Sequence, residues 1–246
     1  MYTLAQFSDI QRTSTYSLPI KVKQKIHALC KQLGTELPFT MVQDTSNIKD
    51  CLRELNKMTE ENKEEKMKLI CSILEKNQEE IQSFAPLFFQ SLCKQVFFSK
   101  IYASLFLYLQ QWTIFQDVFQ NQYKIYVDSF HAIHTCSPDE YDEYCRLKKE
   151  NDERRAFSVF MVYCVQNGSV ARSCYDETMK ILVKCIKDTL MLDKKEVMNE
   201  YVEHLYLLVT TMKQMHPIVG EIIKMNPKDY PGLNHKMIFR CMDIKV

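Results

Sequence analysis

One stretch, residues 152–187, restricts the fold more than any other part of the chain. Its first half carries apolar residues at positions 0, 3, 4 and 7, the spacing of one face of an α-helix: Phe157, Phe160, Met161 and Cys164. Asn167-Gly168 then predicts a helix end, because glycine adopts the left-handed conformation without a Cβ penalty. Ser169 is the expected cap of a second helix with the same apolar spacing: Thr178, Ile181, Leu182 and Cys185. Neither face can be buried alone, so this helix hairpin requires neighbouring helices.

Scarce glycine supports a helical fold for the whole chain. Only 4 glycines occur in 246 residues, whereas sandwiches, barrels and dinucleotide-binding sheets need many turns. Helical spacing predicts further helices over residues 20–33, 48–58, 59–74, 78–97, 99–111, 114–134, 141–151, 201–212 and 234–244. Thr59, Ser99 and Ser137 are expected helix caps.

The helix pairs recur about every 35–45 residues, within the length of known helical repeats. We therefore predict an all-α fold, a HEAT-repeat solenoid of about five antiparallel helix pairs over residues 20–246. Residues 1–19 are polar and are predicted to form a flexible N-terminal arm. The hydrophobic fraction of 46% is sufficient for a sizeable core.

Charge and cysteine content indicate the kind of protein. The net charge is +1, which argues against coating nucleic acid by bulk charge but leaves local basic patches open. The 10 cysteines lie in or beside the apolar faces, and residues 1–11 do not resemble a secretory signal. No apolar run is long enough to span a membrane. We expect a reducing, cytoplasmic compartment and no membrane partner.

The sequence has no clear motif for catalysis or cofactor binding. One histidine and cysteine group has partial zinc-site spacing, but surface and core roles explain it better: His131, His134, Cys136 and Cys145. Four acids are explained by helix capping and the helix dipole: Asp139, Glu140, Asp142 and Glu143. The four glycines lie too far apart for a phosphate-binding loop. We therefore expect no enzyme, no cofactor and no metal.

Two basic groups are candidate RNA contacts. Arg154 and Arg155 belong to a basic cluster at the start of the hairpin, together with Arg146, Lys148 and Lys149. Lys180, Lys184 and Lys187 share one face of the second helix. For each group taken alone, a solvated charged face is the better explanation. Weak, sequence-independent phosphate binding needs no more than such a face, so both readings stay open.

Four segments, in the right order over residues 45–246, resemble a known family, the HEAT-repeat middle domain of eukaryotic translation initiation factor four-G. Residues 55–61 (LNKMTEE) are similar to its Leu-Asn-Lys-Leu-Thr-Pro-Glu signature, and residues 98–103 (FSKIYA) to its Phe-Ser-x-x-Tyr-Ala. Arg154-Arg155 and the following helix resemble its third-repeat arginine motif. Residues 233–244 resemble its closing helix. The chain differs from the family at Glu60, where the family has proline, and at Ser158-Val159, where it has Gly-Asn.

The resemblance implies a translation initiation scaffold that binds and stimulates a DEAD-box RNA helicase of the initiation-factor four-A type. Candidate helicase contacts are Leu52, Leu55 and Met58 at one end and Phe239 and Arg240 at the other. Leu52 and Leu55 are equally consistent with plain core positions. An alternative is an RNA-binding adaptor of mRNA decay, splicing or poly(A)-dependent regulation, because such proteins share this domain.

The arm carries one further expectation. Members of the family bind the cap-binding protein through a tyrosine followed by apolar residues at fixed steps. Tyr2 and Phe7 have that relationship here, and Ile10 supplies a further apolar anchor. Docking of the same residues on the first repeat is the other interpretation.

Overall fold

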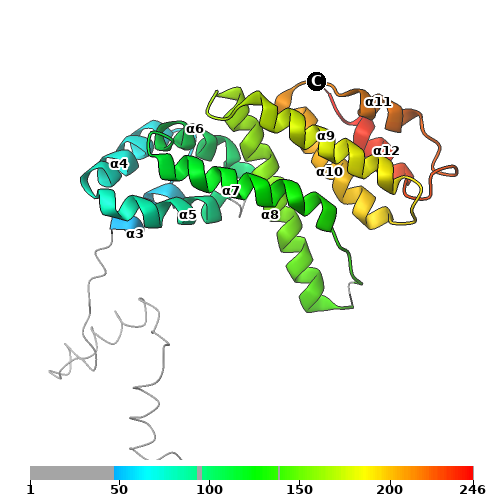
Figure 1. Cartoon of the computed structure of the whole chain (residues 1–246), viewed down its shortest axis with the longest axis horizontal. Helices are drawn as coiled ribbons and strands as arrows, with labels where there is room; N and C mark the ends of the chain where they lie inside the picture. Colours follow the sequence, from blue (N-terminus) through cyan, green and yellow to red (C-terminus); the bar gives the residue numbers. More distant parts are fainter. Residues whose placement is uncertain (1–46, 93–95, 138, 246) are drawn as a thin grey trace, which may run out of the picture. The chain divides into compact units, whose positions relative to one another are not determined.

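The computed structural model describes residues 47–92, 96–137 and 139–245, and every regular element in these ranges is helical (Figure 1). The ten α-helices of this part are α3 (Asn47–Asn56), α4 (Lys63–Lys76), α5 (Ile81–Leu92), α6 (Ser99–Leu109), α7 (Thr113–Ser129), α8 (Tyr141–Gln166), α9 (Arg172–Thr189), α10 (Lys195–Met212), α11 (Pro217–Lys224) and α12 (His235–Met242). Three 3₁₀ turns accompany them: η1 (Gln78–Glu80), η2 (Val96–Phe98) and η3 (Phe130–Ala132). The predicted all-α class is confirmed for these residues; the predicted arm and the helix over residues 20–33 lie outside them.

The turn of the central hairpin forms where glycine was expected to end the helix. Gly168 has a φ of 81°, the left-handed region, and directly follows the C-cap residue Asn167 of α8. Ser169, however, does not cap the next helix: α9 begins after Ala171, and no side chain caps it. The Ser169 hydroxyl instead donates to the Cys164 carbonyl, 3.2 Å away, at the end of α8. A serine between two helices can satisfy either end, and here it serves the first.

None of the other predicted caps occupies an N-cap position. Thr59 and Asn62 exchange two hydrogen bonds, but Asn62 occupies the N-cap position of α4, so Thr59 lies ahead of the cap and was wrongly predicted. Ser99 was wrongly predicted as a cap, since it is the first residue of α6 and its buried hydroxyl donates to the Ala156 carbonyl in α8. Ser137 was also wrongly predicted, because Glu140 occupies the N-cap position of α8.

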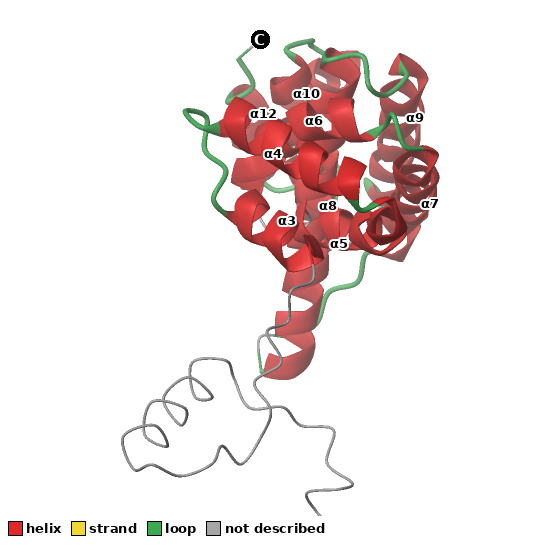
Figure 2. Cartoon of the chain, turned by 90° about the vertical axis from the view of Figure 1, so that its left-hand side faces the viewer, coloured by secondary structure: helices red, strands yellow, loops and turns green. Residues whose placement is uncertain are grey.

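The helices form two series of neighbours. Helices α4, α6, α8, α10 and α12 each pack against the next one in that order. Helix α3 packs against α5, and α5 against α7. The pair α3–α4 joins the two series, and α9 and α11 pack against α10 and α12 of the first series (Figures 1 and 2). Helix α8 is the most connected element, with α5, α6, α9, α10 and η2 around it.

The two halves of α8 differ in burial, although the helix is continuous. The predicted helix at residues 141–151 runs on into the hairpin helix without a break. Between Tyr141 and Glu153, Leu147 is the one buried side chain, and both views show these turns extending beyond the neighbouring helices (Figures 1 and 2). From Arg154 to Cys164 nearly every side chain is buried. Because neighbouring helices cover this half on nearly every side, its buried residues include more than the four apolar positions predicted from helical spacing.

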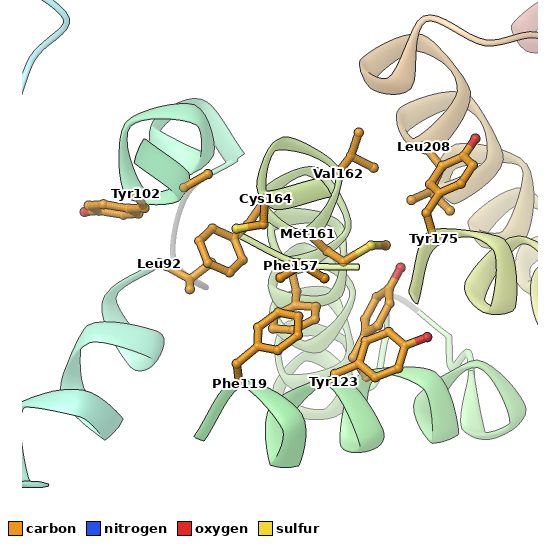
Figure 3. Close-up of a cluster of buried hydrophobic side chains, with 14 of the residues drawn as sticks. Leu92, Tyr102, Phe119, Tyr123, Phe157, Met161, Val162, Cys164, Tyr175 and Leu208 are labelled. Atoms are coloured by element: carbon orange, nitrogen blue, oxygen red, sulfur yellow. The ribbon is translucent and has the colours of Figure 1, made fainter. Parts of the chain in front are cut away.

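An aromatic cluster fills the space around the second half of α8 (Figure 3). Phe119 of α7 stacks on Phe157, with ring centroids 6.0 Å apart and planes at 20°. Phe89 of α5 and Phe106 of α6 meet Phe160 edge-on, at centroid distances of 6.1 and 5.7 Å. Such offset and edge contacts each add about 0.5–1.5 kcal/mol beyond area burial. This cluster therefore joins α5, α6, α7 and α8 into one core.

Candidate functional site

Helix α12 presents an aromatic side chain to solvent at the C-terminal end of the helix series. Met237, Ile238 and Cys241 are buried, while Phe239 is 60% exposed. The helix starts at an Asn234 cap whose side-chain oxygen accepts from the Met237 amide at 3.1 Å. This cap and the three buried positions fix the rotation of α12, so Phe239 points away from the core.

The neighbouring Arg240 is held in place by α10. Its Nε and Nη2 donate to Glu203 Oε2 at 3.1 and 2.8 Å. Its Cζ lies 3.5 Å from the ring centroid of Tyr206, a cation–π contact. The guanidinium is thus pre-organised while remaining one-third exposed.

We call this region the Phe239 surface: Glu203, Tyr206, His235, Phe239 and Arg240. The rings of His235 and Phe239 lie one helical turn apart, with centroids 6.4 Å from each other. An open depression of about 470 Å³ is lined by Phe239 and Arg240 together with Glu203, Lys236 and Asp243. A partly exposed aromatic beside a fixed arginine is the composition of a protein-binding hot spot.

The helicase contacts predicted at the other end occupy a different environment. Leu55 and Met58 are each 1% exposed, and Leu52 is half-buried. Leu55 and Met58 are therefore core side chains in this conformation, and only Leu52 retains accessible surface. The buried Glu54 beside them accepts from Lys66 Nζ at 2.7 Å. This hydrogen bond lowers the pKa of Glu54 to about 2.

The structure separates the two predicted basic groups. Lys180, Lys184 and Lys187 are exposed on α9, and Lys187 pairs with Glu221 at 3.7 Å. Arg154 is buried, and its guanidinium donates to Ser129 Oγ and Asn151 Oδ1. Arg155 binds both oxygens of Glu200, at 2.7 and 2.6 Å. Internal hydrogen bonds thus occupy the two arginines, whereas the lysines keep their charge in solvent.

A buried serine and histidine pair resembles a nucleophile and base but has no access to solvent. Ser158 Oγ and His204 Nδ1 are 3.0 Å apart, and both residues are 0% exposed. Ser158 Oγ also lies 3.0 Å from the Arg154 carbonyl oxygen and 2.7 Å from the Tyr126 hydroxyl. Burial, with Arg154 and Arg155 nearby, holds the pKa of His204 well below its usual value. The pair is a structural network that links α7, α8 and α10.

The remaining predicted sites are the histidine and cysteine group and the residues of the N-terminal arm. His131 Nδ1 lies 3.7 Å from Cys185 Sγ, and within the described ranges no group of three metal-ligand side chains comes together. Tyr2, Phe7 and Ile10 lie outside the described residues. Glu203 and Tyr206 were missed, because their role depends on α10 packing against α12, which no local pattern encodes.

Among the described helices, none combines the length and the apolar character needed to cross a bilayer. Comparison of the chain with family models, with curated proteins and with solved structures finds no match.

Proposed function

We propose that the chain is a non-enzymatic scaffold that binds a DEAD-box RNA helicase through the Phe239 surface. The observation that carries this proposal is the outward position of Phe239 beside an arginine fixed by Glu203 and Tyr206. Residues 233–244 are also a segment through which the sequence resembles the middle domain of initiation factor four-G. In that family this end of the domain holds one lobe of the helicase.

The helix neighbours support a solenoid as the framework for this function. Helices α4, α6, α8, α10 and α12 form one row of consecutive contacts, and α3, α5 and α7 form part of a second. We propose five HEAT-like pairs, α3–α4, α5–α6, α7–α8, α9–α10 and α11–α12, of which α3–α4, α9–α10 and α11–α12 pack directly against each other. A stack of this kind presents separate surfaces at its two ends, which suits a protein that holds two lobes of one partner.

The other end contributes less direct contact. Leu55 and Met58 are buried, so in this conformation they support the surface rather than touch a partner. Leu52 is the proposed contact there, because it is half-buried and lies on α3.

A binding experiment tests the proposal directly. The purified chain is titrated with a purified helicase of the initiation-factor four-A type, and RNA-dependent ATP hydrolysis by the helicase is measured. We expect binding and faster hydrolysis, and Phe239→Ala weakens binding by about tenfold or more. Met191→Ala is the matched control, since Met191 is 66% exposed but lies at the end of α9. Failure to bind or stimulate any such helicase contradicts the proposal.

A second candidate function is an RNA-binding adaptor, and the lysine face of α9 favours it. Lys180 and Lys184 have no ion-pair partner within the described residues, so their charges are available to phosphates. Charge reversal of both residues would weaken binding to single-stranded RNA and reduce its salt dependence by about one unit of slope per contact. Equal binding by the reversed variant contradicts this function.

The same proposal places the chain in the cytoplasm and joins its arm to a cap-binding protein through Tyr2, Phe7 and Ile10. A variant lacking residues 1–19 should lose capture by a purified cap-binding protein while keeping the helicase. Retained capture contradicts this role of the arm.

A further inference from the structure

A polar cleft lies between α8, α10 and α12, beside the Phe239 surface but separate from its aromatic ring. Its volume is about 380 Å³, within the range of small-molecule sites. The first half of α8 forms one wall, and the starts of α10 and α12 form the others. His134, Thr135 and Cys136, from the link between α7 and α8, close one side. The cleft shares only Lys236 with the depression beside Phe239.

Positive charge converges on the cleft from three helices. Lys148 of α8, Lys195 of α10 and Lys236 of α12 line it. With Arg155, the lining has four cations against the two carboxylates of Glu196 and Glu200, a net charge of +2.

The ion pairs around the cleft leave part of this charge unmatched. Glu200 is fully engaged by Arg155 through both of its oxygens. Lys148 and Lys236 have no ion-pair partner in the part of the chain that the structure describes. Lys195 pairs at 3.4 Å with Asp193, a well-exposed side chain that can release it. An anion entering the cleft therefore meets ammonium groups without displacing a buried pair.

Amide groups add specific donors and acceptors. Asn151, Asn199 and Asn234 line the cleft, one from each helix or its cap. The side-chain oxygens of Asn151 and Asn234 already accept from Arg154 and from the Met237 amide. Their Nδ2 groups, and the whole Asn199 amide, have no hydrogen-bond partner among the described residues. Tyr144 and His134 place exposed rings at the same cleft.

We propose that the cleft binds a nucleoside 5′-monophosphate group, either as a free nucleotide or as the 5′-terminal nucleotide of an RNA strand. Three lysines from different directions suit the dianionic phosphate, which has oxygens on several sides. Amides match the edge of a base, and an exposed aromatic ring provides a stacking surface. An extended acidic peptide fits less well, because the volume is that of one small ligand rather than a long groove. This site is independent of helicase binding through Phe239.

Equilibrium titration of the full chain tests the proposal. The probes are the four ribonucleoside monophosphates, the matching nucleosides, inorganic phosphate and a short RNA with either a 5′-phosphate or a 5′-hydroxyl end. Monophosphates or the 5′-phosphorylated RNA should bind at least about tenfold more tightly than the phosphate-free forms. Preference for phosphorylated RNA over the free monophosphate assigns the site to strand ends, and equal affinity assigns it to free nucleotide.

Variants locate the binding. Lys148→Ala combined with Lys236→Ala should weaken binding of the monophosphate by about tenfold or more, because two ammonium groups are removed from the cleft. Both lysines are exposed, so their removal should not disturb the core. Lys68→Ala with Lys76→Ala removes the same charge from exposed positions on α4, far along the chain from the cleft residues, and should leave the affinity unchanged. Equal loss of affinity in both variants, or binding of nucleosides as tight as that of the monophosphates, would overturn the proposal. Melting curves and circular dichroism check that both variants fold.

Discussion

Arg240 lies over the ring of Tyr206, with its guanidinium carbon 3.5 Å from the ring centroid, and at the same time binds Glu203 on the same helix as Tyr206. The two residues of α10 lie three positions apart and so share one face. Two side chains of α10 therefore define the orientation of the partly exposed Arg240 guanidinium.

Removing the Tyr206 ring should change the orientation of the Arg240 guanidinium without changing its charge. Tyr206→Leu retains Arg240 and Glu203 but removes the cation–π contact, worth about 0.5–2 kcal/mol. We expect helicase binding to weaken several-fold while the chain stays folded, as measured by titration and thermal melting. Ile238→Ala is the contrasting variant, because Ile238 is buried and its loss lowers stability by about 2–5 kcal/mol. Unchanged binding by Tyr206→Leu would show that orientation of Arg240 is irrelevant.

Gly232 should not tolerate a side chain. A Cβ on Gly232 would lie 2.6 Å from the Thr189 carbonyl oxygen and 2.9 Å from the Leu192 carbonyl oxygen. The Gly232 amide donates to the Leu190 carbonyl at 3.0 Å, which holds the backbone in this position. Gly232→Ala is expected to cost about 1–3 kcal/mol in unfolding free energy, because backbone must shift. Gly220→Ala is the control: it lies inside α11 with no atom near its would-be Cβ, so it should be neutral or stabilising. Chemical denaturation of both variants measures the difference.

Glu54 should make the chain sensitive to acid. The Lys66 hydrogen bond lowers its folded pKa to about 2 from an ordinary value of 4.5. Between pH 2 and pH 4.5, Glu54 is protonated in the unfolded chain but ionised in the folded one. Its contribution to the free energy of unfolding is therefore complete above pH 4.5 and is lost as the pH falls towards 2. Glu54→Gln should flatten the stability profile in this window, measured by urea unfolding at several pH values. Glu61→Gln, which removes an exposed carboxylate, should keep the original profile.

His204 should add a second loss of stability at milder acidity. Its folded pKa lies well below the ordinary 6.5, since burial and two nearby arginines oppose its charge. An unfolded His204 therefore takes up a proton that the folded one refuses, and stability falls as the pH drops below 6.5. His204→Asn should lower stability near neutrality but make it less dependent on pH below 6.5. A parallel shift of the whole curve would contradict this account.

Helical spacing predicted much of the fold, because a stripe reports which face is buried. Phe157, Phe160 and Met161 are all in the core, and Gly168 ends α8 as expected. The serine caps were less predictable, since one hydroxyl can bond either forwards or backwards along the chain. Ser99 illustrates the limit: its partner is the Ala156 carbonyl, 57 residues away.

The candidate sites depended more on tertiary packing. The sequence predicted Arg154 as an exposed RNA contact. In the structure its side chain is buried, and the guanidinium donates to Ser129 and Asn151. Ile238 is buried and Phe239 exposed because of the way α12 packs against α10 and α11. The cleft gathers Lys148, Lys195 and Lys236, which are too far apart in sequence for any local motif to connect them.

The continuity of α8 connects the cleft to the core through one helix. Lys148 and Phe160 lie on the same unbroken helix, the first at the cleft and the second within the aromatic cluster. A ligand that steadies the exposed turns would also resist fraying of the helix from that end. Amide protons deep in α8 would then exchange more slowly with solvent whenever the cleft is filled. Ligand binding at the surface would thus be measurable as slower hydrogen exchange in the core.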